Sequence, residues 1–267
     1  MSRIASCLEK LKSQQRSALI PYVTAGDPDP SVTVPLMHAM VEAGANLLEL
    51  GVPFSDPMAD GPVIQAASER ALKHHVGLKD VISMVAEFRL KDQDTPVILM
   101  GYLNPIEVMG YEHFSKLANE AGVDGVLTVD IPPEESHDLV ETFKQNQIDP
   151  VYLIAPTSTE ERIRAICANA SGFVYYVSVK GVTGAAHLEV QSVEEKLQEI
   201  RQFTDLPIGV GFGISDAERA AQVAAVADAV VVGSAIVNRV AAGDGDLDRI
   251  TAAVSELLQS MRKAMDN

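Results

Sequence analysis

Two carboxylates, Glu49 and Asp60, stand in contrasting surroundings along one short stretch of the sequence. Glu49 ends an apolar run that includes Ala45, Leu47 and Leu48, so we expect a partly desolvated side chain with a pKa raised toward neutrality. Asp60 lies in a turn rich in glycine and proline, where we expect it to remain ionised. Two acids in different environments can divide the work of acid/base catalysis, so we predict both as catalytic.

Each carboxylate also has a purely structural interpretation. Glu49 could pair with a basic side chain or turn to water at the end of a strand. Asp60 could cap the helix that follows it, with Pro62 at the first helical position.

Short β-branched or leucine-rich runs alternate with helical patterns along the chain. The predicted strands span residues 19–24, 46–51, 97–101, 125–129, 151–155, 173–178, 208–211 and 229–233. The predicted helices span residues 31–43, 62–74 with 78–91, 110–121, 133–146, 159–168, 193–204, 215–224 and 246–265. We also expect an amphipathic N-terminal helix and a short helix that opens at Ile236, after the eighth strand.

This alternation predicts an α/β fold with parallel strands. Eight strand–helix units, and no G-x-G-x-x-G after the first strand, favour a closed (β/α)8 or TIM barrel over an open doubly wound sheet. We expect residues 1–267 to form this single domain. In such a barrel the chemistry lies at the C-terminal ends of the strands, where Glu49 falls.

Glycines near the last two predicted strand ends indicate a phosphate site. Gly213 follows the seventh strand, and Gly233 and Ser234 follow the eighth. Glycine lets backbone amides approach phosphate oxygens, and a helix N-terminus adds partial positive charge. The same glycines could instead serve tight turns between packed elements.

Composition excludes several classes of protein. Lys+Arg total 21 against Asp+Glu 37, and the net charge of -16 repels nucleic acid and anionic membranes. Cys7 and Cys167 belong to no metal-spaced or redox pair, which is typical of a reducing compartment. With no signal peptide and no apolar run long enough for a membrane span, we expect a cytoplasmic protein.

Five motifs carry a resemblance that extends over the whole chain. They are residues 48–57 (LELGVPFSDP), 59–62 (ADGP), 181–184 (GVTG), 211–214 (GFGI) and 233–237 (GSAIV). In this combination and order the sequence resembles the tryptophan synthase alpha subunit family. The resemblance implies reversible retro-aldol cleavage of indole-3-glycerol phosphate to indole and glyceraldehyde 3-phosphate. It also implies an alpha2-beta2 complex whose beta subunit carries pyridoxal phosphate, with no cofactor on this chain.

The resemblance also implies roles for individual residues. Glu49 would transfer the protons, and Asp60 would accept a hydrogen bond from the indole N–H. An apolar slot for the substrate would comprise Tyr22, Met100, Leu127, Val129, Leu153, Tyr175 and Phe212, with Thr183 also binding substrate. The phosphate would lie on amides near Gly184, Gly213, Gly233 and Ser234. Because Asp60 sits in a proline-bounded loop, and Gly181 and Gly184 offer hinges, we also expect the partner to order the loops of residues 53–60 and 180–183.

Two departures from the family pattern bear on function. Val179 and Lys180 stand where the family usually has Arg and Ala, and Tyr22 stands where it often has Phe. The added hydroxyl of Tyr22 needs a hydrogen-bond partner in the slot. Two other functions stay open: a Schiff-base aldolase that uses Lys180, and a non-catalytic regulatory subunit.

Overall fold

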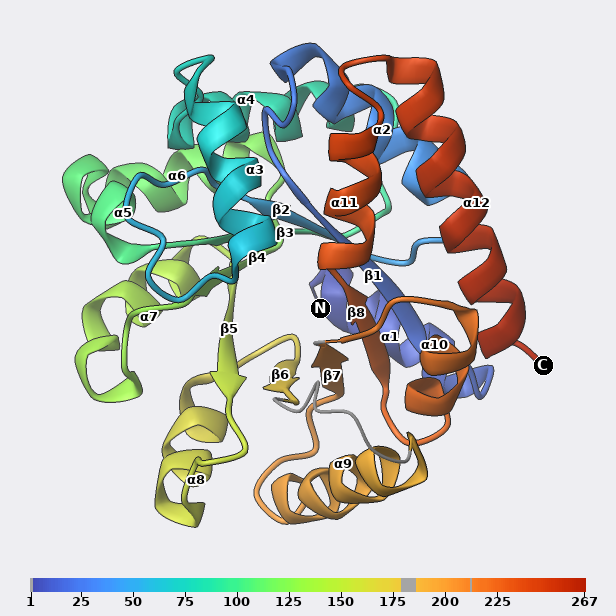
Figure 1. The fold of residues 1–267 in the computed structure, drawn as a ribbon. Coiled ribbons are helices and arrows are strands. Elements are labelled where there is room, and N and C mark those ends of the chain that lie inside the picture. The colour runs from blue at the N-terminus through green and yellow to red at the C-terminus, as the bar shows by residue number, and fades with distance from the viewer. Residues whose placement is uncertain (1, 179–185, 212) are drawn as a thin grey trace.

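Parallel strands in chain order form a closed barrel. The computed structural model describes residues 2–178, 186–211 and 213–267, and within them β1 to β8 pair in sequence until β8 meets β1 (Figure 1). The strands are β1 (Ala18–Thr24), β2 (Leu48–Gly51), β3 (Val97–Gly101), β4 (Gly125–Thr128), β5 (Asp149–Ile154), β6 (Val174–Val177), β7 (Ile208–Gly211) and β8 (Ala229–Val232). The predicted (β/α)8 barrel is therefore confirmed.

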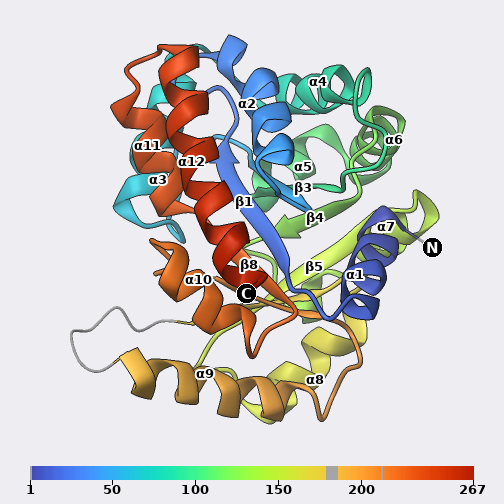
Figure 2. The same ribbon diagram turned by 90° about the vertical axis from the view of Figure 1, so that its right-hand side faces the viewer.

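Helices surround the barrel (Figure 2). They are α2 (Pro30–Glu42), α3 (Pro62–Leu72), α4 (Leu78–Arg89), α5 (Leu103–Met109), α6 (Tyr111–Ala121), α7 (His137–Gln145), α8 (Glu160–Asn169), α9 (Ala186–Ile200), α10 (Ala217–Ala224), α11 (Ser234–Ala242) and α12 (Leu247–Met265). In α12, Ile250, Val254, Leu257, Leu258 and Met261 are all buried, which is the spacing of one helical face. No helix in the described ranges has the length and apolar character that a membrane span requires.

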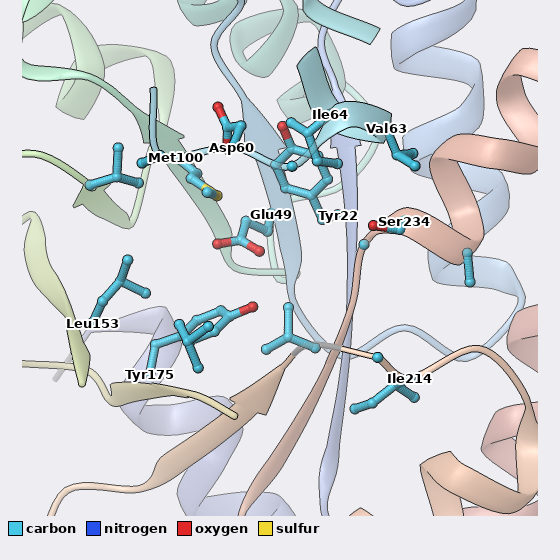
Figure 3. A pocket seen from close by; sticks show the side chains of 18 of the residues that line it. Tyr22, Glu49, Asp60, Val63, Ile64, Met100, Leu153, Tyr175, Ile214 and Ser234 are labelled. Atoms are coloured by element: carbon cyan, nitrogen blue, oxygen red, sulfur yellow. The ribbon is translucent and has the colours of Figure 1, made fainter. Parts of the chain in front are cut away.

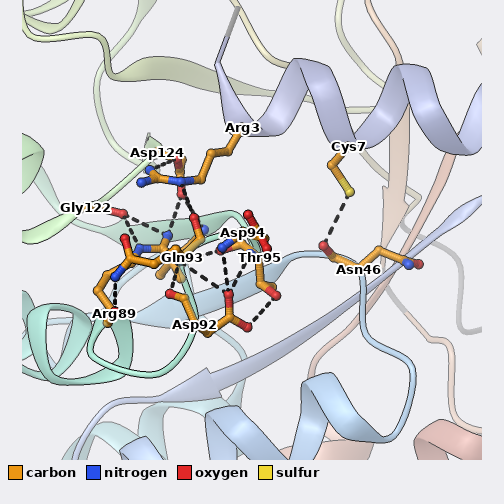
Figure 4. Close-up of polar contacts among 11 residues, drawn as sticks. Arg3, Cys7, Asn46, Arg89, Asp92, Gln93, Asp94, Thr95, Gly122 and Asp124 are labelled. Atoms are coloured by element: carbon orange, nitrogen blue, oxygen red, sulfur yellow. Dashed lines mark hydrogen bonds and ion pairs between the residues drawn. The ribbon is translucent and has the colours of Figure 1, made fainter.

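The N-terminal helix α1 (Arg3–Ser13) closes one end of the barrel. Its buried residues Ile4, Leu8 and Leu11 join a core cluster with inward-facing strand residues. At the same end Arg3 and Arg89 donate to opposite oxygens of the buried Asp124 carboxylate, at 2.8 and 2.7 Å (Figure 4). Because this end is filled by apolar side chains and sealed by paired charges, the open end lies at the strand C-termini.

Several predicted elements differ from those in the structure. Helix α5 was not expected, because Asn104 and Pro105 indicate a turn; both lie in its first turn, where a missing proline N–H costs no helical bond. Helix α9 begins at Ala186 instead of 193. The predicted helix 133–146 is a 3-10 turn (Pro133–Glu135) followed by α7. Helix α11 begins at Ser234, two residues before Ile236.

Candidate active site

A cavity of about 470 Å³ opens at the C-terminal ends of the strands (Figure 3). This volume falls in the range of small-molecule sites, roughly 300–1,000 Å³. Its predicted lining residues are Tyr22, Glu49, Asp60, Met100, Leu127, Val129, Leu153, Tyr175, Gly213, Gly233 and Ser234. The structure thus brings together these residues from β1 to β8. Thr183, Gly184 and Phe212, together with Lys180, lie outside the described residues.

Glu49 lies in the middle of β2 and points into the cavity, where its side chain is 2% exposed. Its Oε1 atom has no hydrogen-bond partner among the described residues. Burial, and to a lesser extent the negative charge of Asp60, together raise the pKa of Glu49 to about 8. The apolar run before Glu49 correctly predicted this raised pKa, and no basic side chain of the described chain pairs with the carboxyl.

Asp60 reaches the same cavity from the loop between β2 and α3. Its Oδ2 atom accepts a hydrogen bond of 2.9 Å from the hydroxyl of Tyr102, which follows β3. Burial raises the pKa of Asp60, and the hydrogen bond from Tyr102 opposes that shift. The glycine- and proline-rich turn around Asp60 gave no sign of this burial, which arises because the loop folds back over the cavity.

The capping interpretation of Asp60 also fails. Gly61 is the N-cap residue of α3, and no side chain makes a capping hydrogen bond there. The carboxylate of Asp60 turns away from the helix and toward Tyr102 and the cavity. Asp60 is therefore available to a ligand.

Tyr102 is a member of the site that the sequence analysis missed. Its buried hydroxyl donates to Asp60 and accepts from the backbone N–H of Ala59, both at 2.9 Å. Its ring stacks on Phe54 with 4.8 Å between centroids. The available signal was an aromatic hydroxyl directly after a predicted strand, where barrel chemistry lies. These contacts join the loop of residues 53–60 to the segment that follows β3.

Tyr22 and Tyr175 form two walls of the cavity, and each ring needs a glycine on the next strand. A Cβ atom on Gly51 would clash with the hydroxyl of Tyr22, and one on Gly211 would clash with that of Tyr175. The extra hydroxyl of Tyr22 bonds to Thr24 at 3.1 Å, so the departure at this position has the partner it requires. Burial raises the pKa of both tyrosines, so they stay neutral.

The far side of the cavity includes two glycines and the start of a helix. Gly213 has φ +75°, and among the described residues no atom beyond its chain neighbours lies within 4 Å of the place where its Cβ would be. Its carbonyl accepts a 2.8 Å hydrogen bond from Arg219, which supports the turn. Gly233 precedes α11, and Ser234 begins that helix at the cavity wall. No lysine or arginine lines the described part of the cavity, so an anion there would depend on amides and the helix N-terminus.

Comparison with known proteins agrees with this geometry. A family model described as "Tryptophan synthase alpha chain" matches residues 8–266. The chain is 66% identical to the tryptophan synthase alpha chain of Thioalkalivibrio sulfidiphilus over 266 residues, which cover 100% of each protein. It is 58% identical to that of Marinobacter nauticus, over 100% of this chain and 99% of the relative.

Solved structures give the same result. The crystal structure of tryptophan synthase subunit alpha from Legionella pneumophila superposes with a TM-score of 0.93 and 46% identity, over 100% of this chain and 99% of that one. The fold, the order of its motifs and the full-length similarity lead to one conclusion. The chain belongs to the tryptophan synthase alpha chain family.

Proposed function

We propose that this chain cleaves indole-3-glycerol phosphate by a retro-aldol reaction and releases indole and glyceraldehyde 3-phosphate. The observation that carries the proposal is a single cavity with three kinds of lining. A buried carboxylic acid, Glu49, lies at its floor, a second carboxylate, Asp60, lies at its rim, and glycine backbone lines the opposite side. Each lining matches one part of the substrate.

The cavity suits a flat apolar ring joined to an anionic tail. Met100, Leu127, Leu153 and the rings of Tyr22 and Tyr175 would hold the indole ring. The phosphate would lie against the amides near Gly213, Gly233 and Ser234, where α11 begins. Because the chain carries a net charge of -16, these local groups must offset the long-range repulsion of an anionic substrate.

Glu49 would carry the proton in both directions. With a pKa of about 8 the carboxyl is protonated at neutral pH, so it can give its proton to C3 of the indole ring. The bond between C3 and the glycerol carbon then breaks, and its electron pair returns to the ring. The glycerol hydroxyl becomes the aldehyde, and its proton goes back to the Glu49 carboxylate, so no net proton is consumed.

Asp60 would act through its charge. Protonation at C3 places positive charge on the indole nitrogen, and a carboxylate that accepts the N–H hydrogen bond stabilises that charge. The half-buried position of Asp60 strengthens such an interaction relative to water. Because Tyr102 bonds to Oδ2, the other carboxylate oxygen, Oδ1, would accept this bond.

We also propose a partner, a tryptophan synthase beta subunit in an alpha2-beta2 complex. The pyridoxal phosphate would belong to the beta subunit, and this chain would need no cofactor. Met58 is 86% exposed on the loop that carries Asp60, and Val108 is 82% exposed on the neighbouring helix α5. Large exposed apolar side chains beside a site suit a protein interface, which supports docking at this rim.

An indole-release assay with the purified chain tests the function. We expect slow release of indole from indole-3-glycerol phosphate, and faster release when the beta subunit is added. No release in either condition would favour a regulatory subunit. Borohydride trapping of the chain with substrate tests the alternative that Lys180 forms a Schiff base, and a covalent adduct would overturn the proposed mechanism.

A further inference from the structure

Gln65 in the first turn of α3 binds the loop that carries Asp60. Its side-chain Nε2 atom donates to the carbonyl oxygen of Asp60 at 2.8 Å and to that of Pro57 at 3.4 Å. Pro57 and Asp60 are the first and last residues of one turn, closed by a 3.1 Å hydrogen bond from the N–H of Asp60 to the carbonyl of Pro57. The two N–H groups of a single amide therefore hold both ends of the turn.

Gln65 does not line the cavity, although Val63 and Ile64 just before it do. Its side chain therefore contacts the loop and not the space that a substrate would fill. Any effect of Gln65 on chemistry must pass through the position of Asp60.

The helix that carries Gln65 is itself firmly placed. Ala67 of α3 is fully buried and packs in one cluster with Tyr22 and Val237. At the other end of α3, Arg70 donates two hydrogen bonds, of 2.6 and 2.8 Å, to the buried carboxylate of Asp27 in the loop after β1. A side chain on so well anchored an element can set the position of a loop.

We infer that Gln65 is a positioning residue for the reaction: it fixes the backbone of Asp60 so that the carboxylate meets the substrate at the correct distance. This inference rests on the proposed function, in which Asp60 acts on the indole nitrogen. The loop then has two anchors, with Gln65 on the backbone and Tyr102 on the carboxylate. A carboxylate displaced by even about 1 Å loses much of its effect on a transition state.

The first experiment compares two matched variants in the alpha2-beta2 complex. Gln65→Met keeps the length of the side chain and removes both donors, and we expect kcat for indole release to fall about tenfold with KM within about twofold of wild type. Gln198→Met is the control, because the side chain of the exposed Gln198 bonds, among the described residues, to Glu194 of its own helix, and it should leave kcat unchanged. Wild-type kcat in Gln65→Met would overturn the inference.

A double-mutant cycle with Asp60→Asn separates positioning from a general loss of structure. If Gln65 acts through the Asp60 carboxylate, Gln65→Met should cost about tenfold in the wild-type background and less than about twofold in the Asp60→Asn background. An equal loss in both backgrounds would show that Gln65 only supports the fold, and would overturn the inference. If Gln65→Met is recovered unfolded, Gln65→Asn takes its place, since it keeps the amide but cannot reach the loop.

The same cycle distinguishes failure of this inference from failure of the proposed function. Full activity in Asp60→Asn alone would reject the role of Asp60 itself. Loss of activity in Asp60→Asn with wild-type activity in Gln65→Met would reject only the role of Gln65.

Discussion

The hydroxyl of Tyr102 donates to Oδ2 of Asp60 at 2.9 Å while it accepts from the N–H of Ala59 at the same distance. The backbone N–H of Ala59 can only donate, so the hydroxyl of Tyr102 accepts from it and donates its own proton to the carboxylate of Asp60. A donor directed at the ionised form lowers the pKa of Asp60 and opposes the effect of burial. Tyr102 therefore helps Asp60 to remain an anion in a cavity that otherwise favours the neutral acid.

Replacing Tyr102 by Phe should weaken catalysis more than stability. The stacking on Phe54 survives the change, but the donor to Asp60 is lost. We expect kcat for indole release to fall about tenfold, a typical effect of losing a hydrogen bond to a charged group, and the pKa of Asp60 to rise. Tyr111→Phe is the control, because the hydroxyl of Tyr111 bonds to Glu107 on the outer surface. Equal kcat values in the two variants would contradict this role.

Asp60→Asn should separate charge from structure. Asparagine can still accept the hydrogen bond from Tyr102, and Asp60 caps no helix, so we expect the melting temperature to change by less than about 2 °C. Indole release should fall sharply, because the charge that stabilises the indole nitrogen is gone. The pKa of Glu49 should also fall, since the charge of Asp60 helps to raise it. A lower melting temperature with intact activity would restore the capping interpretation.

The raised pKa of Glu49 makes a definite prediction about stability. Glu49 has an ordinary pKa of 4.5 in the unfolded chain and about 8 in the folded one. Between these values the folded chain binds more protons, so the contribution of Glu49 to the free energy of unfolding is complete below pH 4.5 and declines as pH rises through about 8. In the wild type the free energy of unfolding should fall by a few kcal/mol between pH 4.5 and about 8 because of Glu49, and Glu49→Gln should remove this fall.

Urea unfolding of wild type and Glu49→Gln at a series of pH values measures that difference. Glu256→Gln, an exposed position on α12, serves as the control. If the free energies of unfolding of wild type and Glu49→Gln differ by a constant amount from pH 5 to pH 9, Glu49 is not buried as a neutral acid.

A valine at Gly213 should obstruct the phosphate. The position has a left-handed φ and open space where the side chain would project, which is the space proposed for the anion. We expect KM for indole-3-glycerol phosphate to rise, and a substrate without phosphate to bind the wild type about as weakly. Gly245→Val is a matched control, since Gly245 also has a positive φ of +80° and open space but lies outside the cavity. It should show the same backbone strain with unchanged KM; a KM that rises equally in both variants would exclude the phosphate site.

The pattern of apolar residues predicted the barrel, because each strand and each helix depends mainly on residues close together in the sequence. The apolar runs, and the position of Glu49 at the end of one of them, are visible along the chain. The surroundings of Asp60 could not be predicted in this way, because they depend on Tyr102, 42 residues away, and on a loop that folds back over the cavity. Helix α5 was missed for the opposite reason. The Asn104-Pro105 pair is typical of a turn when only its neighbours in the sequence are considered, but in the structure a helix begins there.

Indole release by Glu49→Gln tests the central claim most directly. Glutamine keeps the shape of the side chain in its buried place but can neither give a proton to C3 of the indole ring nor take one from the glycerol hydroxyl. We predict that kcat falls by about 10² or more while KM changes little, which is the typical loss when a general acid/base is removed. A turnover close to that of the wild type would contradict the assignment of Glu49 as the residue that transfers the proton.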